Sequence, residues 1–248
     1  MSISYTSVNL LQEPATIQQR LLPYDLPSFE SVEYSAMCRQ AEAVGGDFYD
    51  FMMVPNGKLS IAIGDICGKG LAAALLMATL QATLRAEVSH VPTDLSALMT
   101  TINRLFHGAS LEHLYSTLFY ATFDPATRIV RYVNAGHPPP LIIRERHSDI
   151  EWLTCGGVPI GLFPDCTYTV GSNRLNPGDV MVAYTDGIIE SPNTSGEQWG
   201  VKRLMDIVTA GETRRTVELN RSIMASVDAF SRGARERDDM ALVTLRAI

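Results

Sequence analysis

Aspartates at the ends of apolar, strand-like segments are the residues of this chain best suited to chemistry. They are Asp47 in V-G-G-D-F-Y-D (44–50), Asp65 in G-D-I-C-G-K-G (64–70), Asp186 in Y-T-D-G (184–187) and Asp238 in R-D-D-M (237–240). If their carboxylates meet, each like-charged pair about 4 Å apart costs roughly 4 kcal/mol at an effective dielectric of 20, so cations are required. All-oxygen ligands favour magnesium or manganese over zinc.

A simpler interpretation exists for each aspartate taken alone. An Asp beside Gly is most often a turn former or a helix cap, and we expect that role for Asp50 and Asp179. The combination of aspartates at several strand ends is what favours a metal site.

Other chemistries fit the sequence less well. Gly68-Lys69-Gly70 before a helix could cradle phosphate, but the glycine spacing is wrong for a P-loop and disfavours a nucleotide enzyme. Cys67 lacks the C-x5-R loop of cysteine phosphatases, which argues against a thiolate nucleophile. The four cysteines lack zinc-like spacing, so free thiols in a reducing cytosol are expected.

Composition excludes some classes of partner. The 248 residues include 27 acidic and 20 basic side chains, and the net charge of −7 argues against binding nucleic acid through bulk charge. The longest apolar run, residues 71–78, is too short to cross a bilayer, and the first residues do not resemble a signal peptide. We therefore expect a cytoplasmic protein with no membrane partner.

The elements that must position the aspartates follow from hydrophobic spacing. Residues 48–54 and 58–65 predict a hairpin around Pro55-Asn56-Gly57, because Asn-Gly accepts the positive φ of a tight turn. Asp47 and Asp65 should then emerge at the same open end of that hairpin.

The rest of the chain alternates between strand signals and paired helices. Helices are expected at 13–22, from 71 onward, from 94 onward, at 201–210 and at 216–230. Strands are expected at 31–38, 116–123, 129–134, 140–143, 150–154, 167–175, 180–185 and 240–248. This order indicates an α+β fold with antiparallel sheets covered by helices.

The motifs together resemble a known family. V-G-G-D-F-Y-D (44–50), G-D-I-C-G-K-G (64–70), N-A-G-H-P-P-P (134–140), Y-T-D-G-I-I-E (184–190) and D-D-M (238–240) closely resemble the sporulation and sigma-factor-regulator branch of the metal-dependent protein phosphatase 2C family. The similarity runs from about Ile17 to the C-terminus. It implies a four-layer α/β/β/α sandwich at residues 31–248, preceded by a helix and connector at 1–30.

The resemblance also implies a site with two magnesium or manganese ions. Asp65 would bridge both ions, the backbone carbonyl of Ile66 would bind one, and Asp47 and Asp186 would add ligands. Asp238 would complete the second ion's shell, with Asp239 the less favoured ligand. A metal-activated water would attack phosphorus without a phosphoenzyme, so Asp47, Asp65 and Asp186 would act catalytically through that water.

Several departures from the family pattern bear on the mechanism. The eukaryotic branch has a His where this chain has Cys67, so metal-bound water is the default proton donor; His137 is an alternative, although a structural role suits its Pro-bounded turn better. The bacterial branch often has Arg-Glu before the position of Val44, where this chain has Glu42-Ala43. Arg39 or Lys69 could supply the missing positive charge, or could be solvated surface.

We therefore expect a metal-dependent protein serine/threonine phosphatase. By resemblance its substrate would be a phosphorylated regulatory protein of the anti-sigma-factor antagonist type. The alternative is a non-catalytic module of the same fold that binds the phosphoprotein. Residues 17–23 resemble the segment that connects an upstream sensor or receiver domain in this branch, and this helix could pack on the core or form a homodimer.

Overall fold

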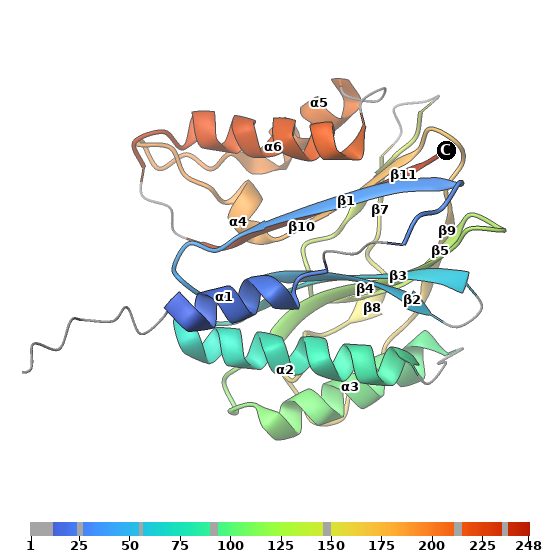
Figure 1. The fold of residues 1–248 in the computed structure, drawn as a ribbon, viewed down its shortest axis with the longest axis vertical. Helices are drawn as coiled ribbons and strands as arrows, with labels where there is room; N and C mark the ends of the chain where they lie inside the picture. Colours follow the sequence, from blue (N-terminus) through green and yellow to red (C-terminus); the bar gives the residue numbers. More distant parts are fainter. Residues whose placement is uncertain are drawn as a thin grey trace, which may run out of the picture.

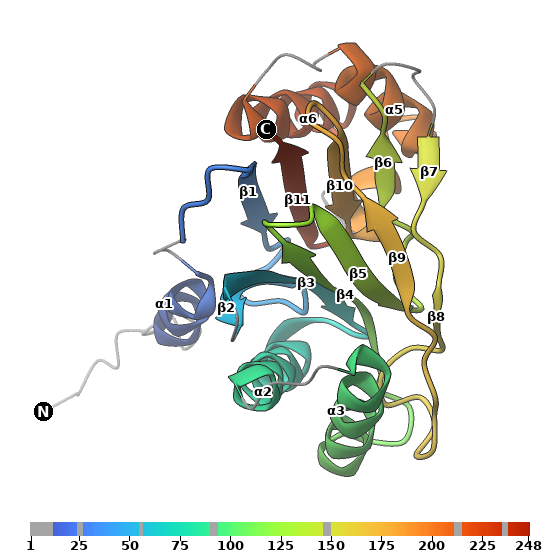
Figure 2. The same cartoon turned by 90° about the vertical axis from the view of Figure 1, so that its right-hand side faces the viewer.

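Two sheets lie face to face, and a pair of helices covers the outer face of each (Figures 1 and 2). The structure is a computed structural model that describes residues 12–23, 27–54, 57–89, 94–145, 150–210, 215–234 and 238–248. The layers confirm the predicted α+β sandwich.

The first sheet carries the hairpin that was expected to hold two of the aspartates. Its order is β2-β3-β4-β5-β8, with β9 also paired to β5. These strands are β2 (Phe48–Val54), β3 (Lys58–Ile66), β4 (Ser116–Asp124), β5 (Ile129–Ala135), β8 (Gly156–Gly157) and β9 (Gly171–Arg174). β2 and β3 pair antiparallel from Phe48 opposite Gly64 to Val54 opposite Lys58, which confirms the hairpin. Pro55 and Asn56 of its predicted turn lie outside the described residues, and Gly57 has φ +71°.

The second sheet pairs the first described strand of the chain with the last. Its order is β1-β11-β10-β6-β7, and the strands are β1 (Val32–Arg39), β6 (Leu141–Ile143), β7 (Ile150–Trp152), β10 (Val180–Tyr184) and β11 (Met240–Ala247). β11 pairs antiparallel with β1 on one side and with β10 on the other. The last strand in sequence is therefore an inner strand of the sheet.

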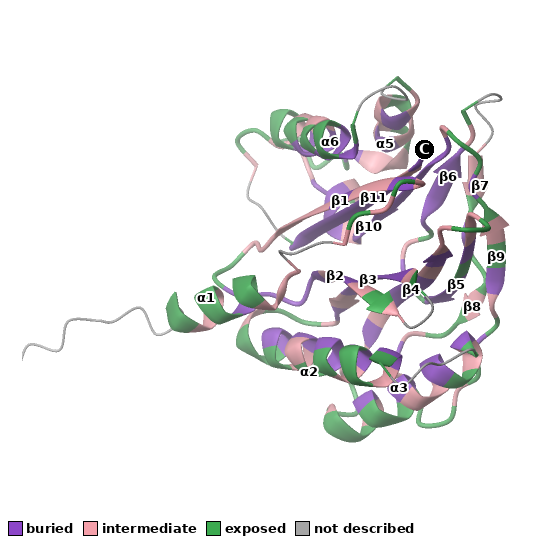
Figure 3. Cartoon of the chain, turned by 45° about the vertical axis from the view of Figure 1, so that its right-hand side comes forward, coloured by how far each residue is buried: buried purple, intermediate pink, exposed green. Residues whose placement is uncertain are grey.

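Three hydrophobic layers separate the four layers of secondary structure (Figure 3). Helices α2 (Gly70–Ser89) and α3 (Leu95–Ala109) cover the first sheet, and α5 (Gly200–Ala210) and α6 (Thr216–Phe230) cover the second. β3 is buried on both faces: Ile61 and Ile63 point into the core between the sheets, whereas Ile66 points toward the helices. Such a strand reads as a nearly continuous apolar run.

Helix α2 is long and apolar enough to cross a membrane by length and composition alone. Its side chains Met77, Leu80 and Leu84 are buried in the core that this helix shares with the first sheet. This packing is that of a core helix, for which the length and composition test is weak evidence of a membrane span.

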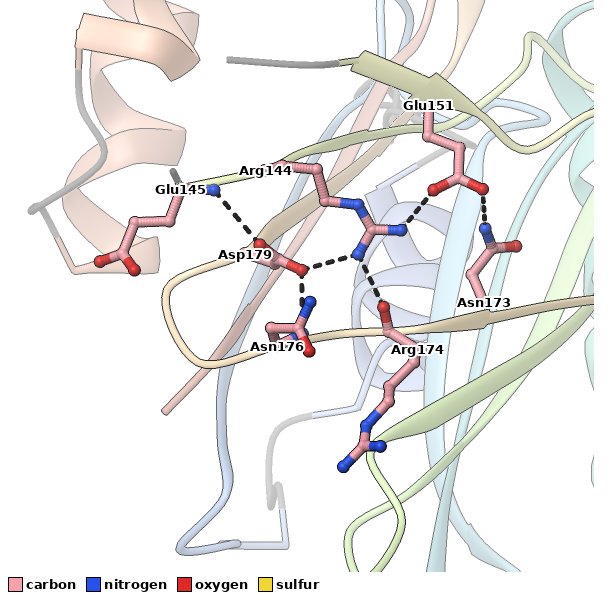
Figure 4. A network of polar contacts seen from close by, with 7 residues as sticks. All are labelled: Arg144, Glu145, Glu151, Asn173, Arg174, Asn176 and Asp179. Atoms are coloured by element: carbon pink, nitrogen blue, oxygen red, sulfur yellow. Dashed lines mark hydrogen bonds and ion pairs between the residues drawn. The ribbon is translucent and has the colours of Figure 1, made fainter. Parts of the chain in front are cut away.

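A polar network closes the edge of the second sheet (Figure 4). Arg144 donates to the Asp179 carboxylate over 2.7 Å and forms an ion pair with Glu151. Asp179 also accepts hydrogen bonds from the backbone N–H groups of Asn176 and Glu145. Asp179 therefore stabilises its turn, as predicted.

The prediction for Asp50 was wrong. Asp50 is not a turn former, because it lies fully buried within β2 and accepts two hydrogen bonds from Arg85 and one from Gln81, both on α2. Burial raises the pKa of this carboxyl, although the hydrogen bonds and charge of Arg85 oppose the rise. The spacing of apolar residues also missed the short elements β8 and α4 (Asp186–Ile189), whose sequences are too short to show a period.

Candidate metal centre

The β2–β3 hairpin brings Asp47 and Asp65 together. Asp47 directly precedes β2, Asp65 is the second-last residue of β3, and Phe48 pairs with Gly64 between them. The charge of Asp65 acts on Asp47, so the two carboxyl groups lie close to each other. This confirms that both side chains emerge at the same end of the hairpin.

Asp186 reaches the same place from the second sheet. It follows β10, begins α4 and lies close enough to Asp65 and Asp47 for its charge to act on both. A Cβ atom on the neighbouring Gly187 would lie 1.8 Å from the carbonyl oxygen of Asp239. Only glycine therefore lets α4 pack this closely on the segment before β11.

Burial and the charges of neighbouring carboxylates raise the pKa values of these carboxyl groups. Burial, followed by the charge of Asp65, raises the pKa of Asp47 well above its ordinary value, against a 2.6 Å hydrogen bond donated by Thr185 Oγ1. Burial and the charges of Asp186 and Asp238 raise the pKa of Asp65 to about 7, although its hydrogen bond with Asp47 opposes this. Burial and the charge of Asp238 also raise the pKa of Asp186.

Asp238 and Asp239 are adjacent in sequence but have different partners. Asp238 is exposed and forms a 2.6 Å ion pair with Lys69 Nζ. Asp239 is buried, and its two carboxylate oxygens accept hydrogen bonds from the backbone N–H groups of Ala41 and Gly46. Asp239 therefore holds the loop that leads to Asp47, which supports the view that it is the less favoured ligand.

Glycines shape the loop around the Ile66 carbonyl. A Cβ atom on Gly46 would lie 2.9 Å from that oxygen, and a Cβ atom on Gly45 would lie 1.9 Å from an Asp239 carboxylate oxygen. The Gly-Gly pair before Asp47 thus lets the loop pack against both groups at once.

The sequence matches a family profile over most of its length. The family described as stage II sporulation protein E (SpoIIE) matches residues 55–248. The chain belongs to this family. The match confirms the resemblance drawn from the motifs.

Two curated relatives of this SpoIIE-family chain align along nearly all of it. It is 27% identical over 264 residues to Protein IcfG of Synechocystis sp., with 95% of the chain and 41% of IcfG covered. It is 25% identical over 234 residues to Phosphoserine phosphatase RsbU of Bacillus subtilis, with 94% of the chain and 68% of RsbU covered. The chain thus spans less than half the length of IcfG.

Solved structures share the fold of this SpoIIE-family chain. The SiaA-PP2C domain of Pseudomonas aeruginosa superposes with a TM-score of 0.82 at 19% identity, and 96% of each chain is covered. RsbX in complex with magnesium and the catalytic domain of PstP in complex with 2 manganese ions give TM-scores of 0.66 and 0.64, each at 14% identity. At these identities the likeness concerns the fold alone.

The residues of this SpoIIE-family site suit hard divalent cations. Buried carboxyl groups that repel one another favour either a bound proton or a bound cation, and hard divalent cations prefer such oxygen donors. Within the described ranges, no three His, Cys, Asp or Glu side chains form a ready-made ligand cluster. The carboxylate oxygens of Asp47, Asp65 and Asp186 are of the donor type that these cations prefer, and Asp238 is paired with Lys69.

The two residues considered for proton transfer lie in different settings. His137 is buried, its Nδ1 lies 3.0 Å from Thr117 Oγ1, and its backbone N–H donates to Asn134 Oδ1. Burial lowers the pKa of His137 to about 3, so the ring is neutral at neutral pH and the placement supports a structural role. The backbone N–H of Cys67 donates to the carbonyl of Tyr115 over 2.8 Å, and the nearby Cys67 side chain raises the pKa of that tyrosine.

Two polar residues that support the site were not identified from the sequence. Thr185 Oγ1 donates a hydrogen bond to Asp47 and accepts one from the backbone N–H of Ala241. Thr185 lies within the Tyr184-Thr-Asp-Gly motif, where the aspartate alone suggested a ligand. Gln18 of α1 (Gln12–Leu21) is buried and makes two hydrogen bonds to the backbone of Gly45. No local pattern could reveal that contact, because its partners lie 27 residues apart.

A cavity of about 910 Å³ opens beside the aspartates. Its wall includes Asp238 and Asp239 at one side and the segment after α4 at the other; basic and acidic side chains lining it include Arg39, Lys69, Glu42, Glu190 and Asp228. The cavity is large enough to receive a phosphorylated side chain with its flanking backbone.

Proposed function

We propose that the chain is a magnesium- or manganese-dependent protein serine/threonine phosphatase. The observation that carries this proposal is that Asp47, Asp65 and Asp186 lie close enough for their charges to act on one another, beside a cavity lined by Asp238 and Asp239. The named activity of RsbU supports the same reaction class. Hydrolysis would consume one water and yield a free hydroxyl side chain and inorganic phosphate.

Two metal ions would be held by the oxygens at this end of the sheets. Asp65 would bridge the ions, the Ile66 carbonyl would bind one of them, and Asp47 and Asp186 would add ligands. Asp238 would complete the second site after it leaves Lys69. When bound, the ions would activate a water molecule for attack on phosphorus and offset charge on the phosphoryl oxygens.

Other residues of the chain would position these ligands. Thr185 fixes the orientation of the Asp47 carboxylate through its 2.6 Å hydrogen bond. Asp239 fixes the glycine loop before Asp47 by accepting two backbone hydrogen bonds. This rigid support favours a single geometry for the ligands.

The biological setting follows by similarity. The substrate would be a phosphorylated regulatory protein of the anti-sigma-factor antagonist type, acted on in the cytoplasm. Residues 31–248 would form the phosphatase domain, and residues 1–30 a helix and connector that receives a signal from a sensor or receiver, with dimerisation as one route.

Hydrolysis of a phosphoserine peptide with manganese tests the proposal. We expect Asp65→Ala or an excess of chelator to reduce the rate at least about a hundredfold, because both remove the ions that stabilise the transition state. Asp124→Asn is a matched control, since Asp124 pairs with Lys58 away from the site. Full activity of Asp65→Ala would exclude the mechanism. Metal-dependent peptide binding without turnover would favour the binding module.

A further inference from the structure

Lys69 lies on the wall of the cavity at the point where β3 ends and α2 begins. It is flanked by Gly68 and Gly70, which have φ of +112° and +67°, conformations that favour glycine. Its side chain is 49% exposed, and its ammonium group lies 2.6 Å from an Asp238 carboxylate oxygen. The first turn of α2 itself carries no acidic residue, and a Cβ atom on Gly70 would lie 3.5 Å from a Glu42 carboxylate oxygen.

The partner of Lys69 is a residue that the proposed function assigns to a metal ion. An ammonium group and a divalent cation on one carboxylate repel each other, so metal binding at Asp238 must displace Lys69. The Asp238 side chain is 52% exposed, which leaves room for this movement. Lys69 has a flexible stem of four carbons and can turn without a change in the backbone.

A phosphoryl group bound in the cavity would give the displaced ammonium group a new anionic partner on the same wall. Glu42, Glu190 and Asp228 also line the cavity and would repel a phosphorylated substrate. The other basic side chain on the wall, Arg39, forms a 2.8 Å ion pair with Asp228 on α6. Of the two described basic residues that line the cavity, Lys69 is therefore the one whose acidic partner would bind a metal ion.

We propose that Lys69 is an exchangeable phosphate-binding residue, which pairs with Asp238 until a metal ion binds there and then binds the phosphoryl group in the same cavity. The proposal rests on the proposed function for the role of Asp238. It gives this chain a phosphate contact in place of the Arg that its sequence lacks before Val44.

The exchange is tested by titrating manganese into metal-free protein in a calorimeter. Lys69→Met removes the competing charge, so we expect the weaker manganese site to bind about two- to fivefold more tightly, the range set by a solvent-exposed ion pair. Lys58→Met is the control, because Lys58 is 38% exposed and pairs with Asp124 at the far end of β3. Unchanged or weaker manganese binding in Lys69→Met would overturn the exchange.

Phosphate binding is tested by titrating inorganic phosphate into the manganese-loaded protein. We expect Lys69→Met to weaken phosphate binding about tenfold and Lys69→Arg to restore most of it, since a charged hydrogen bond to phosphate is lost and regained. Equal phosphate affinity in wild type and Lys69→Met would overturn this role. Both titrations remain decisive if the wild type hydrolyses no phosphopeptide, which would be a failure of the proposed function alone.

Discussion

Two groups of acidic residues in this molecule differ in how their charge is balanced. At the edge of the second sheet, Asp179 and Glu151 flank Arg144, and the chain supplies every donor that these carboxylates use (Figure 4). At the end where both sheets meet, Asp47 and Asp65 have no ion pair with a basic side chain among the described residues, and the charge of Asp65 acts on Asp47.

The difference separates carboxylates whose charge is balanced within the fold from carboxylates whose charge can be balanced by a bound ion. A buried carboxylate is tolerable when an opposite charge and hydrogen bonds accompany it. The Arg144 network satisfies that condition within the chain, whereas the aspartate group satisfies it only with a proton or a cation from solution. Asp50 shows how local the distinction is: three residues after Asp47, it pairs with Arg85.

Manganese provides the largest expected contrast between the two groups. At a free concentration of one hundred times its dissociation constant, manganese should stabilise the wild type by about 2.7 kcal/mol, since it binds only the folded chain. Asp65→Asn should lose this gain, and Asp179→Asn should keep it. Urea unfolding with and without chelator measures both. Equal stabilisation of all three proteins would erase the contrast.

Removing a charge from the Arg144–Asp179–Glu151 network should destabilise the fold in the absence of any metal. Asp179→Asn removes the charge opposite Arg144, whose side chain is 21% exposed, so we expect a loss of about 2 kcal/mol in the free energy of unfolding. Urea unfolding in chelator gives the value. Asp228→Asn serves as the control, because it removes a carboxylate that is 54% exposed and should cost under about 1 kcal/mol.

His137 is a buried titratable side chain that remains neutral instead of pairing with an opposite charge. Its pKa of about 3 lies below the ordinary value of 6.5, so the unfolded chain takes up the proton first as the pH falls. This lowers stability between about pH 6.5 and pH 3, and by about 2 kcal/mol from pH 7 to pH 5. His137→Gln should flatten that part of the profile, whereas His113→Gln, at an exposed position, should not. Parallel profiles for wild type and His137→Gln would contradict the prediction.

The smallest effect should have the opposite sign. In the metal-free protein, Asp47→Asn removes a buried charge but keeps an acceptor for Thr185 and gains a donor for Asp65. We expect stabilisation by about 1 kcal/mol, with loss of manganese binding. Calorimetric melting in chelator, followed by a manganese titration, measures the two consequences. A strong destabilisation would contradict the prediction, because it would mean that the Asp47 charge is balanced within the chain, like that of Asp179.

The sequence predicted what local geometry controls. Asp47 and Asp65 could be placed together because a hairpin fixes which residues share its open end. Residues whose partners are distant were beyond reach: Asp239 binds the backbone of Ala41 across 198 positions, and Gln18 is buried while its neighbour Ile17 is 61% exposed. An amphipathic pattern cannot anticipate a polar residue that is buried for its hydrogen bonds.

The inner position of β11 has a consequence for the order in which the protein can assemble during synthesis. β1 has its only described strand partner in β11, the last of the described strands, and β10 lies between β11 and β6. Asp238 and the Ala241 N–H that donates to Thr185 belong to this same late segment, so the segment must be made before the proposed ligands can gather. A chain that stops short of β11 therefore lacks both the described strand partner of β1 and the N–H group that binds Thr185.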